Sequence, residues 1–257
     1  MTEPTNQPDD QKKDLKGVLE EHSMPFLVHL EELRRRLIKA FLGIILGAAA
    51  AFYFSPEIME FIKLPLARLD IEGVELHNMQ VTGTFYAYLK ISLLTGVVVA
   101  LPWVFYQTWA FISPGLYQRE KIMVLPLVIT STILFLVGAG FCYVVVLPIA
   151  LGFLLGFAAD QITNVITISS YISFAGLLLL AFGFGFQMPI MAYFLGKFGI
   201  VSSKFLAKGR RYAFVIILIV GAIITPPDPL TQILLAVPLY LLYEISIIVV
   251  RLTGKRQ

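Results

Sequence analysis

Apolar runs of membrane-spanning length recur along the chain, and they restrict its fold more than any other feature. The run at 122–147, for example, contains no charged residue. Only 14% of all residues are charged, whereas soluble domains carry about 25%. Because the runs do not alternate between polar and apolar residues, they indicate membrane helices and not the strands of a transmembrane barrel. The expected fold class is an all-α integral membrane protein.

Turn residues and charges divide the chain into six expected spans, at 37–54, 88–110, 122–147, 171–195, 212–224 and 230–250. They make up a membrane domain over 24–250, between a disordered cytosolic tail at 1–23 and a short cytosolic tail at 251–257. The fifth span would reach roughly 20 Å, less than a ~30 Å hydrocarbon core. It therefore either forms a re-entrant hairpin with the sixth span or crosses a locally thinned bilayer.

Basic residues predict the orientation of these spans. With Lys39 counted in the helix that enters the first span, all but three of the 20 Lys and Arg residues fall in segments that the six-span topology puts on one side. The exceptions are Lys63, Arg68 and Lys90. Because basic loops stay on the cytoplasmic side, both termini are expected there. The loop at 55–88 then lies outside, where we expect short amphipathic helices at the membrane surface.

The most charged stretch, 29–36, lies directly before the first span. Glu31 and Glu32 each precede an arginine by four residues, the spacing of helical ion pairs worth roughly 0.3–0.5 kcal/mol each. This pattern alone fits a solvated helix face and one half of a docking site equally well. The other half would be the loop at 111–121, which has a Ser-Pro-Gly break and three consecutive charges on the same predicted side.

Two polar residues fall inside the expected spans. Gln187 lies near the midplane and shares a helix face with small residues, namely Gly183, Gly176, Ser173 and Ser169. This face predicts either a tight helix seam with an amide hydrogen bond across it or an open, wettable groove. Glu244 is either paired with a basic residue near the cytoplasmic surface or a proton or partner site. Together, Gln187 and Glu244 would form the site of a secondary transporter, the alternative function.

Residues for enzymatic chemistry are not evident. The single cysteine, Cys142, lies in an apolar run apart from the three histidines, so no metal site is expected. We find no nucleotide-binding loop of the G-x-x-x-x-G-K-[ST] type and no pairing of a nucleophile with a base. We therefore expect no catalytic residue, no cofactor and no nucleic-acid partner.

Five groups of residues, spread over nearly the whole chain after residue 24, resemble the twin-arginine translocase TatC family. The first two are H-L-x-E-L-R-x-R at 29–36 and the segment around Pro65. The third is Y-Q-x-W-A-F-I-x-P-x-L-Y-x-x-E at 106–120. The last two are F-G-x-x-F at 182–186 with Pro189, and T-P-P-D at 225–228 with Gln232 and Pro238. Their order and their predicted sides of the membrane make the resemblance specific.

The resemblance implies six membrane helices, the last two short, arranged as a concave cup in the bacterial cytoplasmic (inner) membrane with both termini inside. It also implies a non-enzymatic function, the binding of paired-arginine signal peptides on folded precursor proteins. The partners would be TatA-like and TatB-like single-span proteins, further copies of the chain and membrane lipid, and the energy source would be the proton motive force.

Individual site residues follow from the same resemblance. The family's signal-binding residues match Glu32 and Arg34 before the first span, and Phe111 and Glu120 in the first cytoplasmic loop. Matching structural and loop positions are Pro65, Pro114, Asp228, which could also cap the last helix, and Gln232. The intramembrane glutamate of many members falls on Gln187, whose amide can hydrogen-bond but cannot carry a proton.

Overall fold

The structure is a computed structural model that describes residues 8–69, 76–77, 82–112, 124–156, 166–225 and 228–253, with side chains from Leu27 onward except that of Leu76. Within this part, five helical stretches are long and apolar enough to cross a membrane: Leu27–Tyr53, Gly83–Ile112, Val124–Gly156, Ile168–Lys197 and Pro229–Thr253. The expectation of an all-helical membrane protein is therefore confirmed.

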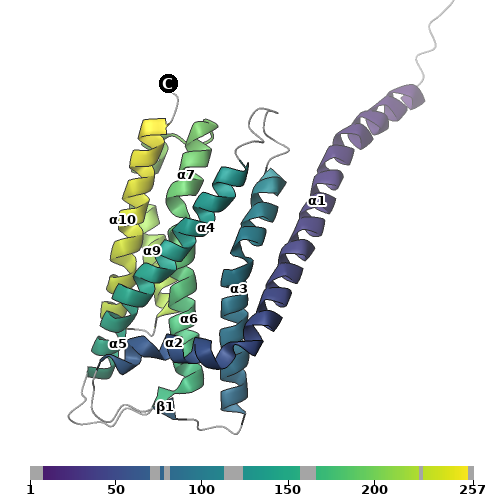
Figure 1. Ribbon diagram of the computed structural model, residues 1–257. Coiled ribbons are helices and arrows are strands. Elements are labelled where there is room, and N and C mark those ends of the chain that lie inside the picture. The colour runs from purple at the N-terminus through teal and green to yellow at the C-terminus, as the bar shows by residue number, and fades with distance from the viewer. Residues whose placement is uncertain are drawn as a thin grey trace, which may run out of the picture.

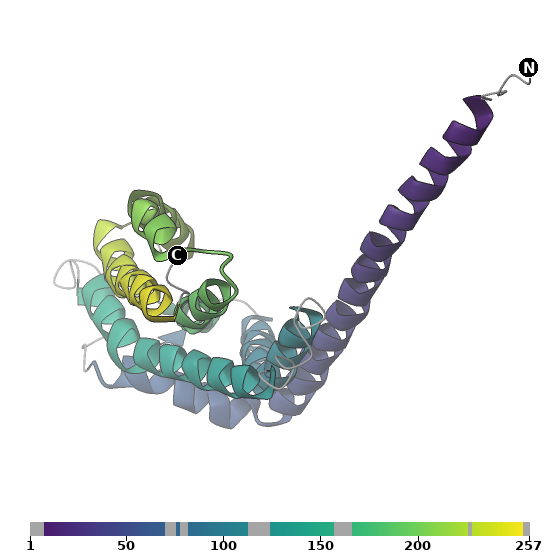
Figure 2. The same cartoon turned by 90° about the horizontal axis from the view of Figure 1, so that it is seen from above.

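Helix α1 (Pro8–Tyr53) is the longest, at 46 residues. It begins at Pro8, so residues 8–23 are helical here, whereas the sequence predicts a disordered tail. Residues 9–24 contain no proline and are rich in Lys, Glu, Gln and Leu, which favour helix. The amino-terminal half of α1 points away from the other helices (Figure 1 and Figure 2).

Helix α3 (Gly83–Ile112) packs along α1 through a seam of small residues. A Cβ atom on Gly96 would lie 2.4 Å from the backbone nitrogen of Ala48, so the two helix backbones approach closely. A hydrogen bond also joins the two helices, because Trp103 Nε1 on α3 donates to the carbonyl oxygen of Lys39 on α1 at 2.9 Å. The seam fixes the position of the 29–36 stretch relative to α3.

Helix α2 (Ser55–Ala67) is one of the short helices expected in the first outer loop, and it runs across the bundle in Figure 1. Pro65 lies inside it and has no N–H for the carbonyl of Phe61 four residues earlier. The hydroxyl of Tyr143 donates to that carbonyl oxygen instead, at 2.5 Å, and Tyr171 donates to the carbonyl of Ile62 at 2.5 Å. The carbonyl that Pro65 leaves without a helical donor is thus one of two backbone acceptors through which α2 is tied to the membrane helices.

The third long helix comprises α4 (Val124–Phe141), the π-helical turn η3 (Cys142–Val146) and α5 (Leu147–Gly156). It runs to Gly156, past Pro148 and past the expected boundary at residue 147. In a regular α-helix, the ring of Pro148 would clash with the carbonyl four residues earlier. The wider π turn directly before Pro148 accommodates the ring, so the helix continues.

The fourth span, expected at 171–195, is two helices, α6 (Ile168–Gly185) and α7 (Met188–Lys197). The break at Phe186–Gln187 arises from Pro189. Pro189 has no N–H to donate to the carbonyl of Gly185, four residues earlier, and its ring would clash with that carbonyl in a continuous helix. Ahead of α6, the two-residue strand β2 (Ile166–Thr167) pairs in parallel with β1 (Leu76–His77), a contact too short to be predicted from sequence.

The chain ends with α8 (Ser203–Lys208), α9 (Arg210–Ile224) and α10 (Pro229–Thr253). Helix α9 has 15 residues and is short, as expected. The expectation that the last helix is also short is wrong, since α10 has 25 residues. Pro229 starts α10 at a position where proline is favoured, and the internal Pro238 does not end it.

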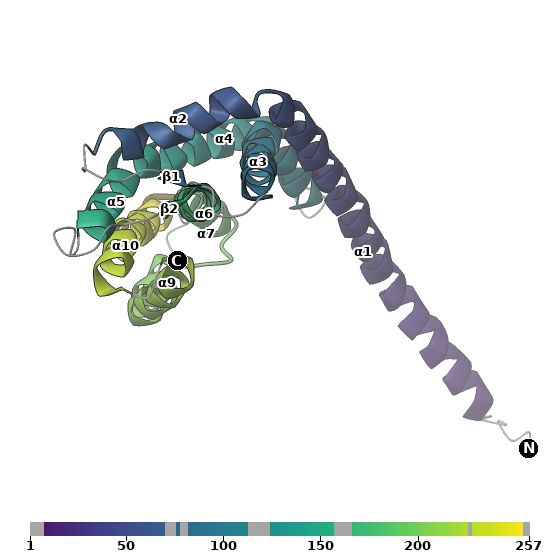
Figure 3. The same cartoon turned by 90° about the horizontal axis from the view of Figure 1, so that it is seen from below.

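The amino end of α1 and the carboxyl end of α10 lie toward the same end of the molecule in Figure 1, together with the carboxyl end of α3 and the amino end of α4. Helix α2 and strand β1 lie toward the opposite end. Seen from below, α2 and α4 run along the outside of an arc, and α9 and α10 lie on its inner side (Figure 3). The largest buried cluster joins α3, α6 and α10 through Ile91, Ile172, Phe182 and Leu235.

Candidate functional site

His29 on α1 and Phe111 at the end of α3 are in direct contact. Their rings stack with centroids 4.4 Å apart and planes at 17°. The 29–36 stretch and the 111–121 loop, the two predicted halves of a docking site, therefore meet at the residue where this loop begins. Pro114 and Glu120, the other predicted residues of that loop, lie outside the described residues.

Glu32 pairs with Arg36, one helical turn further along α1. Arg36 donates from Nη2 at 2.7 Å and from Nε at 2.9 Å, and both bonds end on the same carboxylate oxygen, Oε1. The side chain of Glu32 is 29% exposed. Among the residues that the structure describes, Arg36 engages only one of the two Glu32 oxygens, so the other is open in this part of the chain to an incoming guanidinium.

The two charged residues predicted on α1 differ in the direction they face. Successive helical residues turn by about 100°, so Glu32 and Arg36 lie within about 60° of His29 and thus face the end of α3. Arg34 lies about 140° away on the same wheel. Its side chain is exposed and belongs to neither of the two salt bridges among the described residues. The structure thus brings Glu32, but not Arg34, toward Phe111.

Sequence reasoning missed a buried polar contact that anchors the end of α3. Trp109, two residues before Phe111, is only 4% exposed, and its Nε1 donates to Ser131 Oγ on α4 at 3.1 Å. The Trp109 ring also packs against Phe194 of α7, with centroids 4.9 Å apart. Its place among aromatic residues near the membrane surface gave no signal of this role, because such residues usually face lipid headgroups.

Gln187 completes this contact from the break between α6 and α7. It is 8% exposed, and its Nε2 donates to the carbonyl oxygen of Ser131 at 3.0 Å. On the same face, a Cβ on Gly183 would lie 2.5 Å from the Phe135 ring, so the helices are in close contact. Of the two predicted alternatives for this face, the tight seam describes the part around Gln187 and Gly183.

Glu244 is paired with Arg210 at the start of α9. Arg210 reaches both carboxylate oxygens, from Nε at 2.7 Å and from Nη2 at 2.8 Å. Because Glu244 and Gln187 each have their own partners in separate contacts, they do not form the common site that a transporter would need.

The hairpin of α9 and α10 is held by polar residues near its turn. Asp228 caps α10 by accepting from the backbone N–H of Thr231 at 2.7 Å. Gln232 reaches across to α9, where its Nε2 donates to the carbonyl oxygen of Leu218 at 2.9 Å. Asp228 and Gln232, which are predicted as structural or loop positions, therefore both have hydrogen-bond partners within this hairpin.

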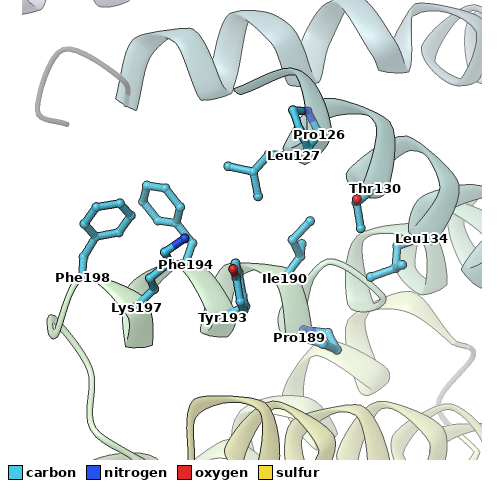
Figure 4. A pocket seen from close by; sticks show the side chains of 10 residues that line it. All are labelled: Pro126, Leu127, Thr130, Leu134, Pro189, Ile190, Tyr193, Phe194, Lys197 and Phe198. Atoms are coloured by element: carbon cyan, nitrogen blue, oxygen red, sulfur yellow. The ribbon is translucent and has the colours of Figure 1, made fainter. Parts of the chain in front are cut away.

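A groove of about 420 Å³ opens between α4 and α7. Figure 4 shows the side chains that line it, which are mostly apolar, with Lys197 as the one charge among them: Pro126, Leu127, Thr130, Leu134, Pro189, Ile190, Tyr193, Phe194, Lys197 and Phe198. Phe194 belongs both to this groove and to the packing around Trp109. The groove is thus connected through packed side chains to the end of α3 that carries Phe111.

Comparison with known proteins gives consistent matches. Residues 28–238 match the family described as TatC, Sec-independent protein translocase protein. The protein of that name from Desulforapulum autotrophicum is 44% identical over 93% of this chain and 88% of its own length. The one from Aquifex aeolicus is 43% identical over 91% of this chain and 98% of its own. For the Escherichia coli K12 protein, the identity is 36% over 88% of both.

A solved structure agrees with this assignment. The crystal structure described as the twin-arginine translocase receptor TatC superposes with a TM-score of 0.81 at 43% identity. The match covers 88% of this chain and 99% of the solved chain. The family match and the relatives together show that this chain belongs to the TatC family of Sec-independent protein translocase proteins.

Proposed function

We propose that this chain is the core of a twin-arginine translocase and receives paired-arginine signal peptides at its cytoplasmic end. The observation that carries this proposal is the stacking of His29 on Phe111. It joins the charged stretch of α1 to the loop after α3, and each of these two segments contributes a carboxylate, Glu32 and Glu120. Two carboxylates are the natural partners of two guanidinium groups.

Binding at this site is expected to be of modest strength. Glu32 already shares one oxygen with Arg36, so a signal-peptide arginine competes with an internal one. Arg34, on another face of α1, would contact a different part of the peptide or precursor. This competition suits a receptor that must release its ligand after transport.

The apolar part of the signal peptide would lie in the groove between α4 and α7. The groove is mostly apolar and reaches the packing around Trp109, two residues from Phe111. A peptide whose arginines bind at Glu32 could therefore continue into it. Its one charged lining residue, Lys197, lies in the last turn of α7.

The proposed topology has six spans in the bacterial inner membrane, with α9 as a short fifth span and both termini in the cytoplasm. At 15 residues, α9 reaches about 22 Å, so it requires a locally thin bilayer. The helices form a cup whose inner side holds α9 and α10. We assign TatA-like and TatB-like single-span proteins and further copies of the chain as partners, with export driven by the proton motive force.

Site-specific photo-cross-linking tests the receptor role. A photoreactive residue at 111 should cross-link to a paired-arginine signal peptide in intact membranes. Glu32→Gln should reduce this cross-linking, because the amide cannot neutralise a guanidinium. Glu31→Gln, on the opposite side of α1, is the matched control and should leave it unchanged. Cross-linking that persists in a Glu32→Gln, Glu120→Gln double variant would exclude the proposed site.

A further inference from the structure

Lys90 makes a polar cluster with α6 at the end of the molecule opposite the proposed receptor site. It lies in the first third of α3, where its side chain is exposed. Its Nζ donates to Ser169 Oγ and to Ser173 Oγ, both at 2.8 Å. The two serines are one turn apart on α6. The cluster therefore holds an ammonium group in a fixed place between two membrane helices.

Two hydrogen-bond donors of this cluster are available to a ligand. Ser173 passes its own hydroxyl hydrogen to the carbonyl oxygen of Ser169 at 2.8 Å. Within the described part of the chain, the third N–H of Lys90 and the hydroxyl hydrogen of Ser169 have no acceptor. Neither ion pair among these residues includes Lys90. Two converging donors and a positive charge that has no ion-pair partner among the described residues suit an anionic oxygen ligand.

An apolar cavity adjoins this cluster. Leu94, one turn along α3 from Lys90, lies against Gly176 on α6, where a Cβ would be 2.1 Å from Leu94 Cδ1. Both residues line a cavity of about 580 Å³ between α2, α3, α4 and α6. Its lining is apolar apart from Glu57, Thr95 and the hydroxyl of Tyr143. An anion site and an apolar cavity one helical turn apart match the two parts of a phospholipid.

We propose that Lys90 and Ser169 bind the phosphate of a phospholipid, that Ser173 holds the Lys90 ammonium in place for this contact, and that one of the lipid's acyl chains enters the adjoining cavity. In the topology proposed above, this lipid comes from the outer leaflet. A soluble anion would explain the ammonium and hydroxyl groups but not the cavity. A charge within a membrane helix is costly without a counterion, and the lipid phosphate supplies one.

Native mass spectrometry of the detergent-purified full chain, titrated with dioleoylphosphatidylglycerol, tests this site. The wild-type protein should retain one lipid that Lys90→Met binds about tenfold more weakly, the effect of losing a charge-assisted hydrogen bond. Lys90→Arg should keep most of the binding, because it keeps the charge. Lys63→Met on α2, at the same end of the molecule, is the matched control for general attraction of anionic lipid and should bind like the wild type.

Two further ligands separate the parts of the proposal. Dioleoylglycerol, which lacks the phosphate, should bind equally to wild type and Lys90→Met. Inorganic phosphate should not displace the retained lipid. Equal lipid affinity in wild type and Lys90→Met, with equal melting temperatures, would overturn the site. A loss as large in Lys63→Met, or displacement by inorganic phosphate, would also contradict a specific phospholipid site. The receptor site at Glu32 is tested separately and does not enter this measurement.

Discussion

The two glutamate–arginine pairs in the described part of this protein differ in what they hold together. Glu32 and Arg36 lie one turn apart on α1 and use a single carboxylate oxygen. Glu244 and Arg210 join α10 to α9 and use both oxygens. The first pair therefore contributes little to the stability of the fold, and its second carboxylate oxygen can bind a ligand. The second pair holds two helices together, so breaking it should destabilise the fold. The same residue types thus indicate a binding role in one region and a structural role in the other.

The largest effect on signal-peptide binding is expected from a change at the seam of α1 and α3, because this seam positions the region around Glu32. Gly96→Ala would place a methyl group against the Ala48 backbone and force the helices apart, at a cost of about 1–3 kcal/mol. The His29–Phe111 contact should weaken, so signal-peptide cross-linking at position 111 should fall strongly. Gly140→Ala is the control, since nothing lies within 4 Å of its Cβ position. Equal cross-linking in both variants would show that the seam does not position the site.

A smaller effect is expected for the buried contact that supports the end of α3. Gln187→Leu removes the hydrogen bond to the Ser131 carbonyl and should destabilise the protein by about 0.6–1 kcal/mol. Gln187→Glu can restore the bond only as the neutral acid, so its melting temperature in detergent should rise toward that of the wild type as the pH falls. A pH-independent difference would mean that the side-chain amide acts as something other than a donor.

A change in the Glu244–Arg210 pair should affect the stability of the protein but not signal-peptide binding. Glu244→Gln leaves Arg210 with a neutral partner and should lower the melting temperature by less than Gln187→Leu does, because the pair is partly exposed to solvent. Signal-peptide cross-linking at position 111 should stay at the wild-type level. Reduced cross-linking in a stable Glu244→Gln protein would remove the distinction between the two regions.

The smallest effect on stability is expected for Glu32→Gln. Loss of a pair one turn apart on an exposed helix costs roughly 0.3–0.5 kcal/mol. Thermal melting should therefore barely separate this variant from Glu31→Gln, although signal-peptide binding separates them clearly. A large drop in melting temperature would instead give Glu32 the structural role assigned here to Glu244.

The sequence predicts well what depends on composition and local order. Apolar runs locate the long helices, and the order of motifs identifies the family. Helix ends are predicted less well, because the π turn before Pro148 and the break before Pro189 depend on packing that no local pattern reveals.

Contacts between residues on different helices could not be predicted from the sequence for the same reason. The sequence predicts that Gln187 is polar and intramembrane, but only the fold shows that its amide donates to the Ser131 carbonyl. The contact of His29 with Phe111 joins residues 82 positions apart. Topology predicts that both lie on one side of the membrane but not that they touch.

The central claim is that the α1 face and the end of α3 act as one site, and a double-mutant cycle tests it most directly. The affinity of a paired-arginine signal peptide would be measured for the wild type, Glu32→Gln, Phe111→Ala and the double variant. A shared site predicts a coupling of about 0.5 kcal/mol or more between the two changes. Strictly additive losses, as expected for a Glu32→Gln, Glu244→Gln control pair, would contradict it.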